Sequence, residues 1–209
     1  MIIQRLAVGM LQTNCYLIGC EETRQGAVID PGGDADRILQ VIDRQELTVR
    51  YVLNTHGHFD HVAANADLIA ATGATLAIHP ADAPLLQENG GATWFGIEVP
   101  KSPPPGLELE PGTTLRLGEL QIQVLATPGH TPGSVTFYEP DAGVAFDGDA
   151  IFSGGIGRTD LPGGDRETLM RSIRETLLAL PDETVLYPGH GPRTTVAEEK
   201  GALQDTASS

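Results

Sequence analysis

N-T-H-G-H-F-D-H, residues 54–61, places three of the six histidines of this 209-residue chain and one aspartate within eight positions. The apolar run at residues 49–53 predicts a strand that leads into this stretch. The alanine-rich stretch that follows predicts a helix that ends at Gly73. The pattern H-x-H-x-D-H therefore lies on a loop at the carboxyl end of a strand, just before a helix.

The spacing within this loop suits metal binding. His56 and His58 are two residues apart at the extended end of the strand, so they project to the same side. Asp60 and His61 lie at the start of the helix and can project to another side. One loop can then serve two neighbouring metal ions. Imidazole and carboxylate ligands suit Zn²⁺ and also Fe or Mn, with Zn–N bonds of about 2.0–2.1 Å.

Two more histidines could complete such a site. T-P-G-H at residues 127–130 and Y-P-G-H at residues 187–190 each follow a predicted strand and end in a histidine. A Pro-Gly turn allows a close approach of the backbone and an exposed side chain, so His130 and His190 are candidate ligands. His79 ends a strand without this turn, and we interpret it as a surface or hydrogen-bonded histidine.

A carboxylate that bridges two cations could come from F-D-G-D, residues 146–149. Asp147 and Asp149 are two positions apart and share a face of the predicted strand. The spacing alone therefore leaves both as candidates.

The composition limits the partners and the compartment. The formal net charge is −15, from 13 basic and 28 acidic residues, which disfavours a nucleic acid bound through its phosphates. Arg5 and the polar residues 12–14 interrupt the apolar N-terminus, so it predicts neither a signal peptide nor a membrane span. Cys15 and Cys20 are too few to staple a fold of this size. We expect reduced, buried thiols and a cytoplasmic protein.

Strand, turn and helix signals run along the whole chain. An N-terminal hairpin, a strand at residues 26–30 and an alternation of helices and strands are predicted for the first half. The second half has short predicted strands joined by Gly and Pro turns, at residues 114–117, 120–126, 134–138, 143–146 and 185–187. Asp165 can cap a helix before the last of these strands. No linker divides the chain, so a single domain, residues 1–209, is expected.

These motifs together resemble the metallo-β-lactamase superfamily over nearly the whole chain. The resemblance rests on motifs in the usual order: D-P-G-G (30–33), T-H-G-H-F-D-H (55–61), T-P-G-H-T-P-G-S (127–134), G-D-A-I-F (148–152) and Y-P-G-H-G (187–191). It implies an α/β fold of four layers, αβ/βα, in which two mixed β-sheets pack face to face between helices. The site is expected at one edge of the sandwich.

The resemblance also implies a role for each candidate ligand. It assigns His56, His58 and His130 to one metal ion, Asp60, His61 and His190 to a second, and Asp149 to the bridge between them. Asp149 is chosen over Asp147 because the family's aspartate follows glycine and precedes a small residue, an aliphatic residue and a phenylalanine. Asp30 resembles the carboxylate that orients a ligand histidine. The alternative for Asp30 is a turn-forming aspartate before proline.

The branch of the family is suggested by residues 148–165, G-D-A-I-F-S-G-G-I-G-R-T-D-L-P-G-G-D. This stretch is similar to small single-domain bacterial hydrolases related to glyoxalase II, the enzyme class that cleaves the thioester S-lactoylglutathione. The classical β-lactamases often replace the equivalent of His61 or have cysteine where Asp149 stands. Hydrolysis of β-lactam antibiotics is therefore disfavoured.

Two features separate the chain from the larger glyoxalases. Arg158 matches a basic substrate-binding position of the family, but Asp160 stands where those enzymes often have tyrosine. The nineteen residues after His190 are too few for their C-terminal glutathione-binding domain. This pattern disfavours glutathione as the carrier of the natural substrate.

We predict a metal-dependent hydrolase with two divalent ions per chain, Zn²⁺ first and Fe or Mn as alternatives, acting on a small-molecule thioester or ester. The nucleophile is a metal-bound hydroxide, because such cations lower the pKa of water from 15.7 to about 7. Asp60 can orient it and accept its proton. The alternative is a persulfide dioxygenase of the same fold and ligand types, which uses one iron to activate O₂.

A long segment between the two halves is a further candidate for function. Residues 89–112 read as irregular, with three consecutive prolines, and long loops in compact domains often line functional sites. Trp94 and Phe95 are hypothesised to contact a substrate. The alternative is that both aromatic residues only pin the loop to the core.

Overall fold

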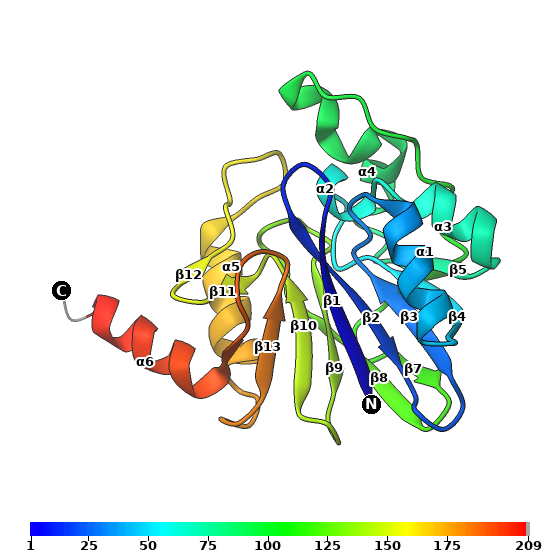
Figure 1. Ribbon diagram of the computed structural model, residues 1–209. Coiled ribbons are helices and arrows are strands. Elements are labelled where there is room, and N and C mark those ends of the chain that lie inside the picture. The colour runs from blue at the N-terminus through cyan, green and yellow to red at the C-terminus, as the bar shows by residue number, and fades with distance from the viewer. Residues whose placement is uncertain (208–209) are drawn as a thin grey trace.

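The computed structural model describes residues 1–207, which form two six-stranded β-sheets packed face to face with helices on their outer sides (Figure 1). The first sheet contains, in spatial order, β1 (Ile2–Val8), β2 (Thr13–Gly19), β3 (Gln25–Ile29), β4 (Thr48–Leu53), β5 (Thr75–Ile78) and β6 (Leu107–Glu108). The second contains β14 (Thr194–Thr195), β13 (Val185–Pro188), β10 (Val144–Gly148), β9 (Val135–Glu139), β8 (Leu120–Ala126) and β7 (Thr114–Leu117). Both sheets mix parallel and antiparallel pairs, as expected from the sequence.

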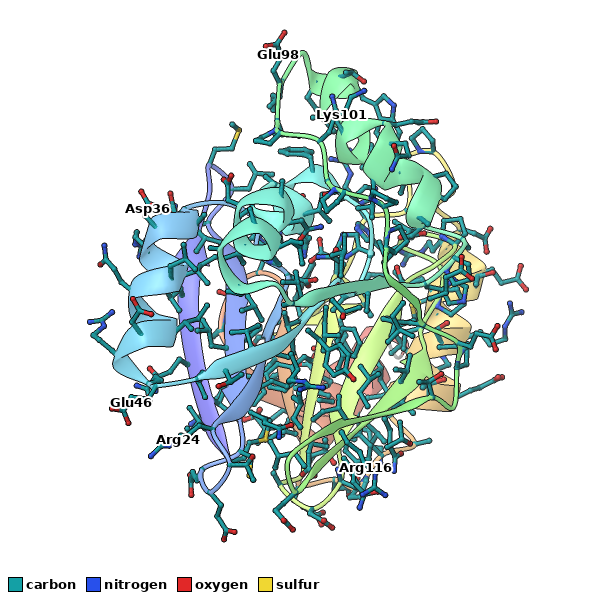
Figure 2. The ribbon with its side chains drawn as sticks, turned by 90° about the vertical axis from the view of Figure 1, so that its right-hand side faces the viewer. Arg24, Asp36, Glu46, Glu98, Lys101 and Arg116 are labelled. Carbon is teal, nitrogen blue, oxygen red and sulfur yellow. The ribbon has the colours of Figure 1, made fainter. Side chains whose placement is uncertain are left out.

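Helices cover the outer face of each sheet. The first sheet carries α1 (Ala35–Arg44) and α3 (Asn65–Thr72), with the short helices α2 (Phe59–Val62) and α4 (Ala83–Gln87) at one edge. The second carries α5 (Arg166–Ser172), which continues as the π-helical turn η2 (Ile173–Leu177), whereas α6 (Val196–Ala207) begins beside β14 and projects away from the sheets (Figure 1). Asp165 caps α5 as predicted, since its side chain accepts a hydrogen bond from the Thr168 backbone N–H. Figure 2 shows Asp36, near the start of α1, on the outside of this layered structure.

The alternation of side chains along each strand creates three separate cores. Leu17 of β2 packs towards the outer helices, whereas the next residue, Ile18, packs into the core between the two sheets. In β10, Phe146 points into the same central core, and Ala145 points to the core under α5. Strands buried on both faces need helices on both outer sides. This requirement accounts for the four-layer αβ/βα fold.

One edge of the sandwich collects the strand ends that carry the predicted ligands. In the first sheet β3, β4 and β5 run parallel, so the residues after them meet at one edge. In the second sheet β10 and β13 are parallel, and β8 runs the same way because β9 is antiparallel to both of its neighbours. Backbone hydrogen bonds from Asn14 N to Gly189 O and from Val135 N to Thr55 O join the two sheets at this edge.

The segment predicted to be irregular is partly ordered into regular structure. Its first part is the 3₁₀-helix η1 (Asn89–Phe95), which bends at Gly90 and Gly91 because both have positive φ angles, and its later part contains β6. Two short strands, β11 (Ile151–Phe152) and β12 (Gly155–Ile156), form a separate ribbon.

Two sequence-based expectations concern the environment of the chain. Cys15 and Cys20 are free and buried, as predicted. Among residues 1–207, no helix has the length and apolar character that crossing a membrane requires.

Candidate metal centre

Three histidines from both sheets converge at the shared edge. His56 and His58 follow β4, and His130 follows β8. The His130 Nε2 atom lies 3.2 Å from His56 Nε2 and 2.9 Å from His58 Nδ1. Ligand atoms around a tetrahedral zinc ion are separated by about 3.3 Å when the Zn–N bonds are about 2.0–2.1 Å. The spacing of these nitrogens therefore fits a shared metal ion.

A second group lies beside the first. His61 Nε2 is 3.4 Å from Asp60 Oδ2, and His190 Nε2 is 3.1 Å from the same oxygen. Asp60 and His61 begin α2, whereas His190 follows β13. Their ligand atoms are all within 4.8 Å of one another. The arrangement matches the expectation that one loop serves two neighbouring sites.

Asp149 faces both groups. Its Oδ1 atom is 3.4 Å from His61 Nε2, and its Oδ2 atom is 3.7 Å from His130 Nε2 and 3.8 Å from His190 Nε2. A carboxylate in this position can bridge two cations.

Asp147 and Asp149 do not share a face, contrary to the expectation from their spacing. The register between β10 and β13 shifts between Phe146 and Gly148, and Gly148 has a φ of 54°. Asp147 is buried, and its Oδ2 accepts a hydrogen bond from Ile151 N. The bulge thus separates a structural aspartate from one that faces the histidines.

Asp30 orients two of the histidines. Its Oδ2 atom accepts hydrogen bonds from the Thr55 hydroxyl at 2.6 Å and from His61 Nδ1 at 3.0 Å, and its Oδ1 accepts from Thr55 N at 2.8 Å. Because the Thr55 proton is donated to Asp30, the hydroxyl oxygen accepts from His56 Nδ1 at 3.0 Å. Both imidazoles therefore direct Nδ1 outward and present Nε2 to the site. The Asp30 side chain thus contacts His61 and Thr55, and its role is not limited to forming the turn before Pro31.

The nitrogens of the first group are placed so that they could share a cation. The Arg158 carbonyl accepts a 2.7 Å hydrogen bond from His130 Nδ1, which leaves the lone pair of His130 Nε2 directed at the site. That lone pair faces the one on His56 Nε2 across 3.2 Å. Among the described residues, the buried atoms His61 Nε2 and Asp149 Oδ1 have no hydrogen-bond partner. Metal ions would satisfy both conditions, so the residues fit a pair of divalent ions.

The electrostatics differ between the two groups. Burial, followed by the neighbouring imidazoles, lowers the pKa of His58 to about 3 and holds the pKa of His56 well below its usual value. Burial alone would also lower the pKa of His61, but the carboxylates of Asp60, Asp149 and Asp30 hold it well above the usual value. The first group thus offers neutral nitrogens, and the second group binds a proton when no metal ion is present.

A glycine makes the close packing of the second group possible. A Cβ atom at Gly189 would lie 2.3 Å from Asp149 Oδ1 and 2.6 Å from His61 Cε1. Any side chain at this position would displace the predicted ligands.

Asp82 contributes to the site and was not predicted from the sequence. It is fully buried, and its carboxylate accepts hydrogen bonds from Gly57 N at 2.8 Å, Gly133 N at 2.7 Å and the Thr131 hydroxyl at 2.7 Å. Gly57 lies between two predicted ligands, and Thr131 follows a third, so Asp82 holds the two ligand loops together. Its position after β5, at the same edge as the other strand ends, is the signal that could have identified it.

Thr13 is a second residue that the sequence did not single out. Its hydroxyl, at the start of β2, donates a 3.0 Å hydrogen bond to Asp60 Oδ2. The N-terminal hairpin thereby fixes the carboxylate that also faces His61 and His190. The alternation pattern of the strand contains no indication of this contact.

A cavity of about 470 Å³ opens over the predicted ligands. It is lined by Leu11, His58, Phe59, Asp60, Phe95, His130, Asp149, Phe152, Ile156, Arg158, Leu161 and His190. Arg158 reaches the cavity as predicted, but its guanidinium is paired with both oxygens of Asp160 at 2.8 Å. Of the two aromatic residues in η1, Phe95 lines the cavity. The Trp94 ring lies edge-on to His58, with the ring centres 6.2 Å apart.

His79 lies apart from this cluster. Its Nδ1 accepts a hydrogen bond from Ala81 N, and among the described residues it joins none of the groups with metal-ligand spacing. The structure thus brings together the seven predicted ligands and leaves out the one histidine that was interpreted as structural. Metal binding by these seven residues stays a prediction.

Comparisons with known proteins connect this geometry to a family. Residues 8–190 match the sequence model of the family described as the Metallo-beta-lactamase superfamily. The chain is 41% identical to the Probable metallo-hydrolase YqgX of Bacillus subtilis, covering 94% of this chain and 93% of that protein. It is 40% identical to the Hydroxyacylglutathione hydrolase GloC of Haemophilus influenzae, covering 96% and 95%. It is 34% identical to the human mitochondrial Persulfide dioxygenase ETHE1, covering 90% and 69%.

Solved structures have the same fold. BLEG-1, described as a B3 metallo-beta-lactamase, superimposes with a TM-score of 0.90 at 34% identity, covering 96% of this chain and 97% of that chain. The di-iron-bound form of TTHA1623 superimposes with a TM-score of 0.86 at 40% identity, covering 94% and 96%.

Proposed function

The chain belongs to the metallo-beta-lactamase superfamily, and from this premise we propose that it is a hydrolase that uses two divalent metal ions to cleave a thioester or a related ester. The observation that carries the proposal is the position of Asp149 between two groups of ligands, each with a spacing suited to one ion. Seven ligands are more than one tetrahedral ion can use.

The residues divide between two ions by their contacts. We propose that one ion is held by His56, His58 and His130, the other by Asp60, His61 and His190, and that Asp149 contacts both. We propose Zn²⁺ as the metal, with Fe or Mn as alternatives, because imidazole and carboxylate suit all three. When bound, such ions supply a water molecule of lowered pKa and polarise a carbonyl group.

The protein residues around the ions position the reactants. Asp60 is held at Oδ2 by Thr13 and His190 and can orient a water molecule and accept its proton. Asp30 and the Arg158 carbonyl keep the Nδ1 protons of His61 and His130 on the outer side of the rings. No serine or cysteine nucleophile is needed for the reaction.

One named relative supports a thioester as the substrate. The Haemophilus influenzae relative is named as a hydroxyacylglutathione hydrolase, and this chain covers 95% of it at 40% identity. A persulfide dioxygenase is the second candidate, because the human enzyme of that name is 34% identical to this chain.

One set of assays on purified, metal-analysed protein tests the proposal. We expect about two metal equivalents per chain and thiol release from S-lactoylglutathione without O₂ uptake. O₂ uptake with glutathione persulfide by protein holding one iron would move the assignment to the dioxygenase. A chromogenic β-lactam belongs in the same panel because of the similarity to BLEG-1. Turnover of the lactam alone would refute the thioester assignment.

A further inference from the structure

The cavity over the ligands has an apolar rim. Beyond the predicted ligands, its lining includes aliphatic and aromatic side chains from four separate segments: Leu11, Phe59, Phe95, Phe152, Ile156 and Leu161. Phe95 packs against Phe59 with the ring centres 5.9 Å apart, so this part of the rim is a continuous apolar surface. A pocket lined mainly by such side chains binds ligands by burying apolar surface.

Large apolar side chains are exposed at and beside this rim. Among the described residues, the large hydrophobic side chains that remain exposed are Met10, Leu11, Trp94 and Phe95. All four lie in the β1–β2 turn and at the end of η1, and one residue from each segment lines the cavity. Leu11 is 49% exposed and Phe95 is 48% exposed. Exposed apolar side chains gathered at a cavity mouth are typical of a ligand-binding surface.

Positive charge available to an anionic substrate is scarce at this rim. Of the described side chains that line the cavity, Arg158 is the only lysine or arginine, and Asp160 holds its guanidinium through two hydrogen bonds. Lys101 does not line the cavity. Arg24 and Arg116 lie at the far edge of the sandwich from Lys101 (Figure 2). The chain as a whole carries a net charge of −15, which repels anions approaching from solution.

From these observations we propose that the site takes an ester or thioester whose portion outside the ligand cluster is uncharged and apolar, such as a medium-length alkyl or aryl group. This inference rests on the proposed hydrolase function and specifies its substrate class. Burial of the apolar portion against Leu11 and Phe95 supplies the binding energy, and the paired Arg158 adds little for a carboxylate.

Two neutral thioesters that differ only in chain length test the apolar rim. We expect kcat/KM for S-hexanoyl-N-acetylcysteamine to exceed that for the S-acetyl compound by about tenfold or more, since each fully buried methylene contributes about fourfold. Leu11→Ser should lower kcat/KM for the hexanoyl compound about threefold relative to the acetyl compound, and so reduce the preference for the longer chain. Met10→Ser is the matched control, because Met10 is exposed in the same turn but does not line the cavity. Equal rates for both chain lengths would overturn the proposal.

A charge variant tests the second half of the argument. Asp160→Asn frees the Arg158 guanidinium, so it should raise kcat/KM for the anionic S-lactoylglutathione about threefold while leaving S-hexanoyl-N-acetylcysteamine within about twofold. Asp141→Asn removes the same charge from the exposed β9–β10 turn and should change neither. A wild-type enzyme that strongly prefers S-lactoylglutathione over the hexanoyl compound would contradict the inference and leave the hydrolase function intact.

A binding measurement separates the substrate class from catalysis. The chain contains one tryptophan, Trp94, whose ring lies beside His58, so its fluorescence reports on the cavity. The non-hydrolysable hexyl thioether of N-acetylcysteamine should bind at least tenfold more tightly than the ethyl thioether. Absence of any thioester turnover together with this preference would refute the hydrolase and keep the apolar site. Equal binding of the two thioethers would refute the apolar site.

Discussion

Removing the carboxylate of Asp82 should loosen both ligand loops at once. This buried side chain is the common acceptor for Gly57 N, Gly133 N and the Thr131 hydroxyl, at 2.7–2.8 Å. Asp82→Ala would leave the two backbone N–H groups without their acceptor. Hydrogen bonds to charged groups contribute about 1.5–3 kcal/mol each to stability. Water that enters the space left by the carboxylate would restore part of the lost stabilisation. We expect a loss of about 3–5 kcal/mol in the free energy of unfolding.

Asp82→Asn is the milder change and keeps the fold available for measurement. Its amide oxygen can replace Oδ2, the acceptor for Gly57 N and Thr131, while its NH₂ group would face the Gly133 N–H, a donor opposed to a donor. Burial raises the pKa of Asp82, so removing the charge also relieves a desolvation cost. The expected loss is about 1–3 kcal/mol.

The functional consequence of Asp82→Asn should be weaker metal binding. The variant would move the loop of His58 relative to that of His130, whose nitrogens are 2.9 Å apart. We expect about a 10- to 100-fold loss in metal affinity or activity, as is typical for groups that support metal ligands. Urea unfolding followed by circular dichroism, metal titration and kcat/KM would be compared with those of Asp141→Asn. Unchanged metal affinity, with an unfolding free energy within about 0.5 kcal/mol of wild type, would refute the role of Asp82.

Three further predictions follow from the same site. Asp149→Asn should abolish turnover and reduce the bound metal below two equivalents with little change in circular dichroism; retained activity would remove Asp149 from the bridge. Phe95→Ala should raise KM several-fold, because Phe95 lines the cavity. Trp94→Ala should mainly lower the metal content or kcat, because the Trp94 ring lies beside His58. The reverse pattern would show that Trp94 is the substrate contact. Acidification from about pH 7.5 to about pH 5.5 should release the ion at His61 first, because the pKa of His61 is raised and a proton therefore competes with the metal ion for this side chain. His58 has a pKa of about 3 and stays uncharged over this pH range, so no proton competes for it. Simultaneous loss of both ions would contradict this prediction.

Local patterns were sufficient where the chemistry depends on neighbours in the sequence. The strand and helix signals around residues 54–61 predicted a strand that leads into this stretch and a helix that follows it, and the structure has β4 before it and α2 from Phe59. The strand ends at Leu53, however, so His56 and His58 lie in the loop after it and not at the extended end of the strand. Short strand signals joined by Gly and Pro turns likewise predicted sheets. Together with the ordered motifs, these patterns determined the fold and the choice of candidate ligands.

Alternation failed where the backbone leaves regular geometry. Asp147 and Asp149 were equivalent by spacing, and the bulge at Gly148, with its positive φ angle, turns them in different directions. A positive φ at a glycine is permitted by the sequence but not required by it. The contact with β13 and the packing against Thr55, where a Cβ at Gly148 would clash, select this conformation in the folded chain.

The sequence by itself determined the residue types, their local spacing and the order of elements, because propensity and side-chain periodicity act over a few neighbouring residues. Only the tertiary structure decided which distant groups share a hydrogen bond or a cavity. Asp82 holds Gly57 and Gly133, which are 25 and 51 residues away, and Leu11 meets Phe95 at one cavity. Such contacts arise when parallel strands deliver their ends to one edge and the two sheets pack face to face. No local pattern in the chain contains that information.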